Sequence, residues 1–173
     1  KMNMTPTETA AFLDPFLTTF SEAVDVDIVI APSFVSLAKA SGMITPNPAV
    51  SLSAQNMSHE ASGAFTGETS AAMLLDVNCE YVILGHSERR SLYGEDDAII
   101  NKKVHATLSA GMKPILCIGE SLEEREGGKL EDVLASQLEG SLADVGADQM
   151  ADIVIAYEPV WAIGSAVTAS PEQ

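Results

Sequence analysis

The chain has 173 residues, 46% of them hydrophobic and 20% charged, as is typical of a single globular domain with its own core. Its 25 acidic and 9 basic residues give a formal charge of −16, which excludes nucleic acids and anionic membranes as partners held by long-range attraction. No apolar run approaches the length of a membrane span and the first residues show no signal-peptide pattern, so we expect a cytoplasmic protein.

The first half of the chain alternates a helix-like segment with short apolar runs. Thr5, Pro6 and Glu8 stand in the order of an N-cap, a first-turn proline and a capping-box acid, and they predict a helix. Because proline lacks an N–H group, Pro15 should kink this helix or divide it in two. The apolar face of the helix comprises Phe12, Leu13, Phe16, Leu17, Phe20 and Val24. Three β-rich runs follow as strand candidates, at 27–32, 50–56 and 81–85.

The second half continues the alternation. Residues 97–110 predict a helix whose apolar side chains recur every four residues and which ends at Gly111. A second helical stripe comprises Leu130, Val133, Leu134, Leu138, Leu142 and Val145. Strand candidates lie at 113–119 and 152–157. Short apolar strands separated by amphipathic helices are typical of parallel βαβ units, so the sequence predicts one α/β domain spanning residues 1–173.

Polar side chains end or directly follow four of the strand candidates. They are Gln55, Asn56, His86, Ser87, Glu120 and Glu158. Ligand chemistry in parallel α/β folds is built at the carboxyl ends of the strands, where loops vary without disturbing the core. The repeated placement therefore predicts a functional site at this edge.

Two of these residues are candidates for catalysis. Glu158 ends an apolar strand and is followed by Pro159 and a short apolar loop, a pattern that fits either a surface turn or a base beneath a loop that closes over it. His86 stands beside a charged cluster, whereas His59 and His105 fit structural roles. Neither the histidines nor the two cysteines, Cys79 and Cys117, have metal-ligand spacing, and we expect no metal.

Six motifs together point to one family. They are KMN (1–3), SAQN (53–56), GAFTGE (63–68), GHSERR (85–90), CIGESLEERE (117–126) and AYEPVWAIG (156–164). In order and spacing the chain resembles triosephosphate isomerases over essentially its whole length. The resemblance implies a parallel (β/α)₈ barrel and a cytoplasmic enzyme of glycolysis and gluconeogenesis. It also implies the interconversion of dihydroxyacetone phosphate and glyceraldehyde 3-phosphate through an enediolate, with no cofactor.

The same resemblance implies roles for particular residues. Glu158 matches the base that moves the carbon-bound proton, and His86 matches a neutral imidazole that donates to the enediolate oxygen. Lys1 matches the catalytic lysine, which also binds the substrate phosphate. Such a local cation is necessary because the protein's acidic excess repels an anionic substrate. The acidic excess also fits a saline source. The Gly164 N–H matches a phosphate donor in a lid that begins at Val160.

Supporting residues and a partner subunit are implied as well. Glu88 either pairs with Lys1 or is a solvated acid at a helix start. Ser87, like Gln55 and Asn56, supports the polar network of the site. The 63–68 loop either places Thr66 near the site of a second copy, which implies a homodimer, or is an ordinary surface turn.

The chain departs from the family pattern at two places. Where the family lid usually reads Thr-Gly-Lys-Thr-Ala, residues 165–169 read Ser-Ala-Val-Thr-Ala, which puts lid closure in question. The family also carries the body of its first strand before the position of Lys1. After the position of Gln173 it carries a helix and two more strands with phosphate-binding loops.

Five strand candidates cannot close an eight-stranded barrel, so we expect a barrel that is incomplete within residues 1–173, part of a longer chain or a fragment. Two alternatives to an active isomerase remain open. One is a catalytically silent fragment or assembly module that lacks the phosphate clamp, and the other is a barrel enzyme acting on a different phosphosugar.

Overall fold

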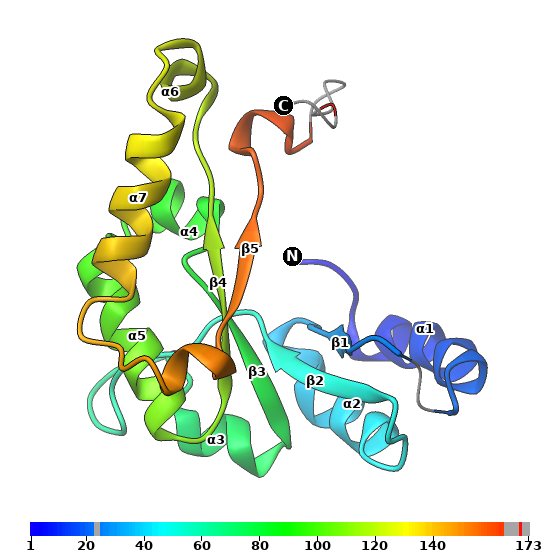
Figure 1. Ribbon diagram of the computed structural model, residues 1–173. Helices are drawn as coiled ribbons and strands as arrows, with labels where there is room; N and C mark the ends of the chain where they lie inside the picture. Colours follow the sequence, from blue (N-terminus) through cyan, green and yellow to red (C-terminus); the bar gives the residue numbers. More distant parts are fainter. Residues whose placement is uncertain (23–24, 165–169, 171–173) are drawn as a thin grey trace.

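The computed structural model describes residues 1–22, 25–164 and 170, in which five parallel strands form one sheet (Figure 1). The strands are β1 (Ile28–Ile30), β2 (Val50–Ala54), β3 (Cys79–Leu84), β4 (Lys113–Ile118) and β5 (Val154–Tyr157). Each strand after β1 pairs in parallel with the strand before it, so the order in the sheet is β1-β2-β3-β4-β5. All five strand candidates are confirmed; four have shorter bounds than expected, whereas β3 begins two residues before its candidate. The sheet curls as part of a (β/α)₈ barrel does, and β1 and β5 form its two edges within the described residues.

Helices connect the strands and pack on the outer side of the sheet (Figure 1). They are α1 (Pro6–Thr19), α2 (Leu37–Ile44), α3 (Ala71–Asp76), α4 (Ser87–Tyr93), α5 (Asp97–Ser109), α6 (Leu122–Glu126) and α7 (Leu130–Ser141). Three 3₁₀ turns complete the described elements: η1 (Phe34–Ser36), η2 (Gln149–Asp152) and η3 (Val160–Ala162). Among the described residues, no helix has the length and apolar character that a membrane crossing requires.

The start of α1 agrees with the sequence, and its middle excludes one of the two outcomes expected at Pro15. The capping box is present, since the Glu8 N–H donates to Thr5 Oγ1 at 3.3 Å and the Thr5 N–H donates to Glu8 Oε2 at 2.8 Å. The expected division at Pro15 is wrong, because α1 runs through this residue without a break. Pro15 and Ala11, whose carbonyl loses its partner, are both exposed, so that water can satisfy the carbonyl. Val24 lies outside the described residues.

The core lies between the sheet and the helices α1, α2 and α5. Its fully buried side chains include Leu13, Leu52, Val82, Leu84, Ile100, Val104 and Leu116. The predicted helix over 97–110 is confirmed as α5, which buries Ile100 and Val104 and ends just before Gly111. Of the predicted stripe, Leu134 and Leu138 on α7 pack against the same core, as do Leu142 and Val145, which follow the end of that helix.

Shortening Ile100 should reveal how much this core contributes to stability. Ile100 is 0% exposed, so Ile100→Ala leaves a cavity and is expected to lower the free energy of unfolding by about 2–5 kcal/mol. The matched control is Leu92→Ala, which alters a side chain that is 74% exposed and should change stability by less than about 0.5 kcal/mol. Urea denaturation of both variants measures the difference; equal losses would contradict the assignment of Ile100 to the core.

Candidate active site

Two pockets open near the carboxyl ends of the strands. The first, here called the Lys1 pocket, has a volume of about 720 Å³ and is lined by Lys1, Gln55, Asn56, His86 and Glu88 among others. The second, the Glu158 pocket, has a volume of about 330 Å³ and its lining includes Ser87, Cys117, Gly119, Ser121 and Glu158. His86 and Ser87 are consecutive, so the start of α4 separates the two pockets. The sequence-predicted residues thus divide between two adjoining hollows.

An ion pair joins the N-terminal segment to α4 in the Lys1 pocket. Lys1 Nζ donates to Glu88 Oε1, which is the pairing that the resemblance implied. This hydrogen bond holds the pKa of the Glu88 carboxyl below its usual value. The side chains of Lys1 and Glu88 remain 44% and 45% exposed, so the ammonium group stays accessible to an anionic ligand.

His86 is the N-cap of α4, and this position determines which ring nitrogen carries the proton. The Glu88 backbone N–H donates to His86 Nδ1 at 3.3 Å. A nitrogen that accepts a hydrogen bond carries no proton, so in the neutral ring the proton lies on Nε2. When its ring is neutral, His86 therefore presents the Nε2 N–H as a donor on the side of the ring that faces away from the helix backbone.

Glu158 directly follows β5 and its backbone prolongs the sheet. The Glu158 N–H donates to the Ile118 carbonyl at 2.9 Å, which continues the pairing of β4 with β5. A Cβ on residue 119 would overlap the Glu158 carbonyl oxygen, so only glycine fits there. Burial, together with the nearby Glu158 charge, raises the pKa of the Cys117 thiol to about 11. Cys117 is therefore a protonated, inert neighbour of the carboxylate.

Two predicted residues lie apart from these pockets. Thr66 belongs to an irregular segment, 61–68, in which every residue is exposed. Gly164 is also exposed and has a backbone φ of 65°, a conformation that glycine adopts without strain. The altered lid residues 165–169 lie outside the described residues.

The sequence placed Glu120 at the functional edge without a particular role, and in the structure its side chain is completely buried and joins several others. Its Oε1 accepts hydrogen bonds from Arg125 Nη1 and Trp161 Nε1, both at 2.9 Å, and from the Tyr157 hydroxyl at 3.4 Å. Burial raises the pKa of the Glu120 carboxyl, but these bonds outweigh burial and the pKa lies below its usual value. Glu120 is thus an anion that ties β4, α6 and the segment after β5 together.

A second buried network supports the Lys1 pocket from behind. Lys103 Nζ donates to Glu95 Oε1 at 2.6 Å and to Asn56 Oδ1 at 2.8 Å, and Arg89 Nε donates to Glu95 Oε1 at 2.6 Å. Asn56, expected to hold polar groups in place, does so. Lys103 could have revealed this network in the sequence, because a lysine next to Val104 falls on the side of the helix that is otherwise apolar.

Acid should weaken this network through Glu95. Burial opposes ionisation of Glu95, but bonds from Lys103 and Arg89 prevail and keep its pKa below the usual value. A lowered folded-state pKa contributes stability above the unfolded-state pKa, and this stability is lost as pH falls through the folded value. We therefore expect Glu95→Gln to be less stable at pH 7 and to lose less stability between about pH 4.5 and pH 3.

Urea unfolding at several pH values tests this expectation. The control is Glu123→Gln, which alters an exposed carboxylate on α6 and should follow the parent curve. If the parent and Glu95→Gln curves run parallel down to pH 3, Glu95 makes no such contribution.

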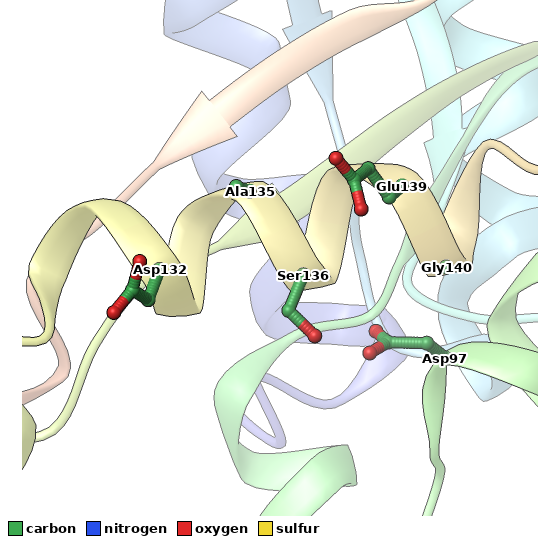
Figure 2. A pocket seen from close by; sticks show the side chains of 6 residues that line it. All are labelled: Asp97, Asp132, Ala135, Ser136, Glu139 and Gly140. Carbon is green, nitrogen blue, oxygen red and sulfur yellow. The ribbon is translucent and has the colours of Figure 1, made fainter.

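A third hollow, of about 610 Å³, lies away from these groups between α5 and α7. Figure 2 shows Asp132, Ser136 and Glu139 on α7, with Asp97 at the start of α5. Carboxylates dominate the lining, so this hollow repels phosphate. The accessible cation of Lys1 makes the Lys1 pocket the better place for an anionic substrate.

Comparison with known proteins agrees with this geometry. The family model described as triosephosphate isomerase matches residues 1–173. The triosephosphate isomerase of Herpetosiphon aurantiacus is 47% identical over 171 residues, which cover 99% of this chain and 68% of that protein. The one of Syntrophotalea carbinolica is 50% identical over 173 residues, 100% of this chain and 68% of that protein. The chain belongs to the triosephosphate isomerase family.

Proposed function

We propose that Glu158, His86 and Lys1 catalyse the reaction of the family, the interconversion of dihydroxyacetone phosphate and glyceraldehyde 3-phosphate through an enediolate. The observation that carries the proposal is the bond from the Glu88 N–H to His86 Nδ1, which leaves Nε2 as a neutral donor. A neutral N–H donor stabilises the negative oxygen of an enediolate by a hydrogen bond.

Glu158 acts as the base in this proposal. It takes a proton from the carbon next to the carbonyl and returns it to the neighbouring carbon, which moves the carbonyl by one position. Glu158 is exposed among the described residues, and a substrate seated over it removes water from the carboxylate. Loss of water strengthens a carboxylate as a base, so substrate binding itself prepares Glu158 for proton abstraction.

Lys1 and the Gly164 N–H bind the charged parts of the substrate. The substrate phosphate carries about two negative charges near neutral pH, and the protein's own charge of −16 opposes its approach. Lys1 lines the Lys1 pocket and keeps its ammonium group accessible although Glu88 holds it in place. Glu88 and Ser87 support the site from the first turn of α4 and do not react.

We also propose that the protein is a cytoplasmic homodimer of single-domain subunits. The support is the 61–68 segment, in which eight consecutive residues are exposed and Phe65 is 44% exposed. Burying this segment against a second copy removes apolar surface from water and brings Thr66 toward the partner's site. Sedimentation equilibrium at several concentrations tests the dimer, and a constant monomer mass at all of them would contradict it.

Substitutions at His86, made in the protein at its natural length, test the catalytic proposal. His86→Gln keeps an N–H donor and is expected to retain about tenfold more activity than His86→Ala, which has none. The rate is measured in both directions with coupled assays, and conversion in D₂O should place deuterium on carbon because an enediolate takes its proton from the base. Equal activity of the two variants, or conversion without deuterium uptake, would contradict the proposal.

A further inference from the structure

We propose that Arg125 is a positioning residue for Glu158, which it holds in place through Glu120 and Trp161. This inference rests on the proposed function, since it takes Glu158 to be the base. Arg125 lies in the CIGESLEERE motif, for which the proposed chemistry has no use.

The segment around Glu158 has two sets of anchors. Its backbone is bound to the β4 end by the Glu158 N–H to Ile118 carbonyl bond at 2.9 Å and by the Val160 N–H to Glu120 carbonyl bond at 3.0 Å. Its side chains are bound through Tyr157 and Trp161, which both donate to Glu120 Oε1. Tyr157 directly precedes Glu158 and Trp161 follows three residues later, so one carboxylate oxygen fixes both sides of the base.

Arg125 contacts both Trp161 and Glu120, whose mutual hydrogen bond is the shorter of the two side-chain anchors. Its Nη1 donates to Glu120 Oε1 at 2.9 Å, and its Cζ lies 5.3 Å from the centroid of the Trp161 ring. The guanidinium therefore fixes the acceptor by a charge-assisted bond and the indole donor by a cation–π contact. The planar guanidinium makes the hydrogen bond to Glu120 and the contact with the Trp161 ring at the same time. An ammonium group is less suited to making both contacts.

The start of α6 fixes where Arg125 points. Ser121 and Glu124 form a capping box, in which the Ser121 N–H donates to Glu124 Oε2 at 2.7 Å. This box sets the direction of the single turn that leads from Glu120 to Arg125. The Arg125 side chain is only 20% exposed and Glu120 is 0% exposed, so water replaces the cation poorly if it is removed. Loss of Arg125 then weakens the hold on Trp161 and, with it, on the segment that carries Glu158.

The experiment compares Arg125→Met and Arg125→Lys in the protein at its natural length. We expect Arg125→Met to lower kcat about tenfold with KM changed by less than about twofold, since a small displacement of a base costs rate more than binding. Arg125→Lys should recover part of the loss. Residues 1–173 contain 1 tryptophan, so once any tryptophan outside them is replaced by phenylalanine, the emission and its quenching by acrylamide report on Trp161, and Arg125→Met should increase the quenching.

Lys113→Met is the matched control. It also removes a cation from an aromatic ring, since Lys113 Nζ lies 5.6 Å from the Tyr81 centroid, but at the amino end of β4. This variant should leave kcat and the Trp161 quenching unchanged. If Arg125→Met lowers thermal stability and leaves kcat at the parent value, Arg125 is a structural residue and the inference is overturned.

A double variant separates this inference from the proposed function. If Arg125 acts through Glu158, adding Arg125→Met to Glu158→Asp should lower kcat by less than about twofold further, because the base is already displaced. Losses that multiply fully would overturn the inference and leave the role of Glu158 intact. Parent-like turnover of Glu158→Asp alone would instead overturn the proposed function, and the inference with it.

Discussion

Replacing Glu158 by aspartate in the active protein is expected to lower kcat by about 10²-fold or more while the fold stays intact. Aspartate keeps the charge but is one methylene shorter, so its carboxylate stands about one bond length farther from the carbon-bound proton. The backbone that carries it does not change, since the residue 158 N–H still donates to the Ile118 carbonyl. The neighbouring Gly119 leaves room for this strand end, since a Cβ there would overlap the Glu158 carbonyl oxygen.

Steady-state kinetics with both substrates measures this effect, and circular dichroism and thermal unfolding confirm the fold. Glu123→Asp is the control, because it shortens an exposed glutamate on α6 by the same methylene. It should retain parent activity. Turnover of Glu158→Asp within a few-fold of the parent would show that Glu158 is not the base.

A polypeptide limited to residues 1–173 is expected to show little or no isomerase activity, although it contains Lys1, His86 and Glu158. This chain spans 68% of the Herpetosiphon aurantiacus relative, and the resemblance places further phosphate-binding loops in the part beyond it. Lys1 and the Gly164 N–H alone must then hold a dianion against a charge of −16. Weak binding of the remote phosphate leaves less binding energy to orient the reacting carbons under Glu158.

The open edge of the sheet also leads us to expect low activity from residues 1–173. Within the described residues β5 pairs on one side only, and its Val154, Ile155 and Tyr157 are each more than 40% exposed. An unpaired apolar strand favours association with other chains over a water-free site. The test is to express residues 1–173, establish folding by circular dichroism and mass by light scattering, and assay both directions. Robust turnover by a homogeneous sample would show that a partial barrel suffices.

The features that could be predicted from the sequence are those that depend on residues close together in the chain. The Thr5–Glu8 capping box involves neighbours three residues apart, and each strand is marked by its own apolar run, so both were found without tertiary information. The placement of His86 and Glu158 at strand ends follows from the parallel topology that those runs predict.

Long-range contacts escaped prediction for a physical reason. Glu120 is separated by 41 residues from Trp161, and only the folded sheet brings the carboxylate within hydrogen-bonding distance of the indole N–H. The continuity of α1 through Pro15 depends on which side of the helix faces water, which the pattern around one proline does not reveal. The short helices α2, α3, α4 and α6 have too few turns to show a clear period, and packing rather than propensity determines them.

The strictly sequential pairing of the five strands has a consequence for how the protein is made. During translation, β2 finds its only earlier neighbour, β1, already synthesised, and every later strand in the described sheet joins an edge that exists when it leaves the ribosome. No strand from β2 to β5 has to await a partner from downstream before its first pairing. The nascent chain can therefore build this sheet one βα unit at a time in chain order, and within the described residues its open edges at any moment are β1 and the newest strand.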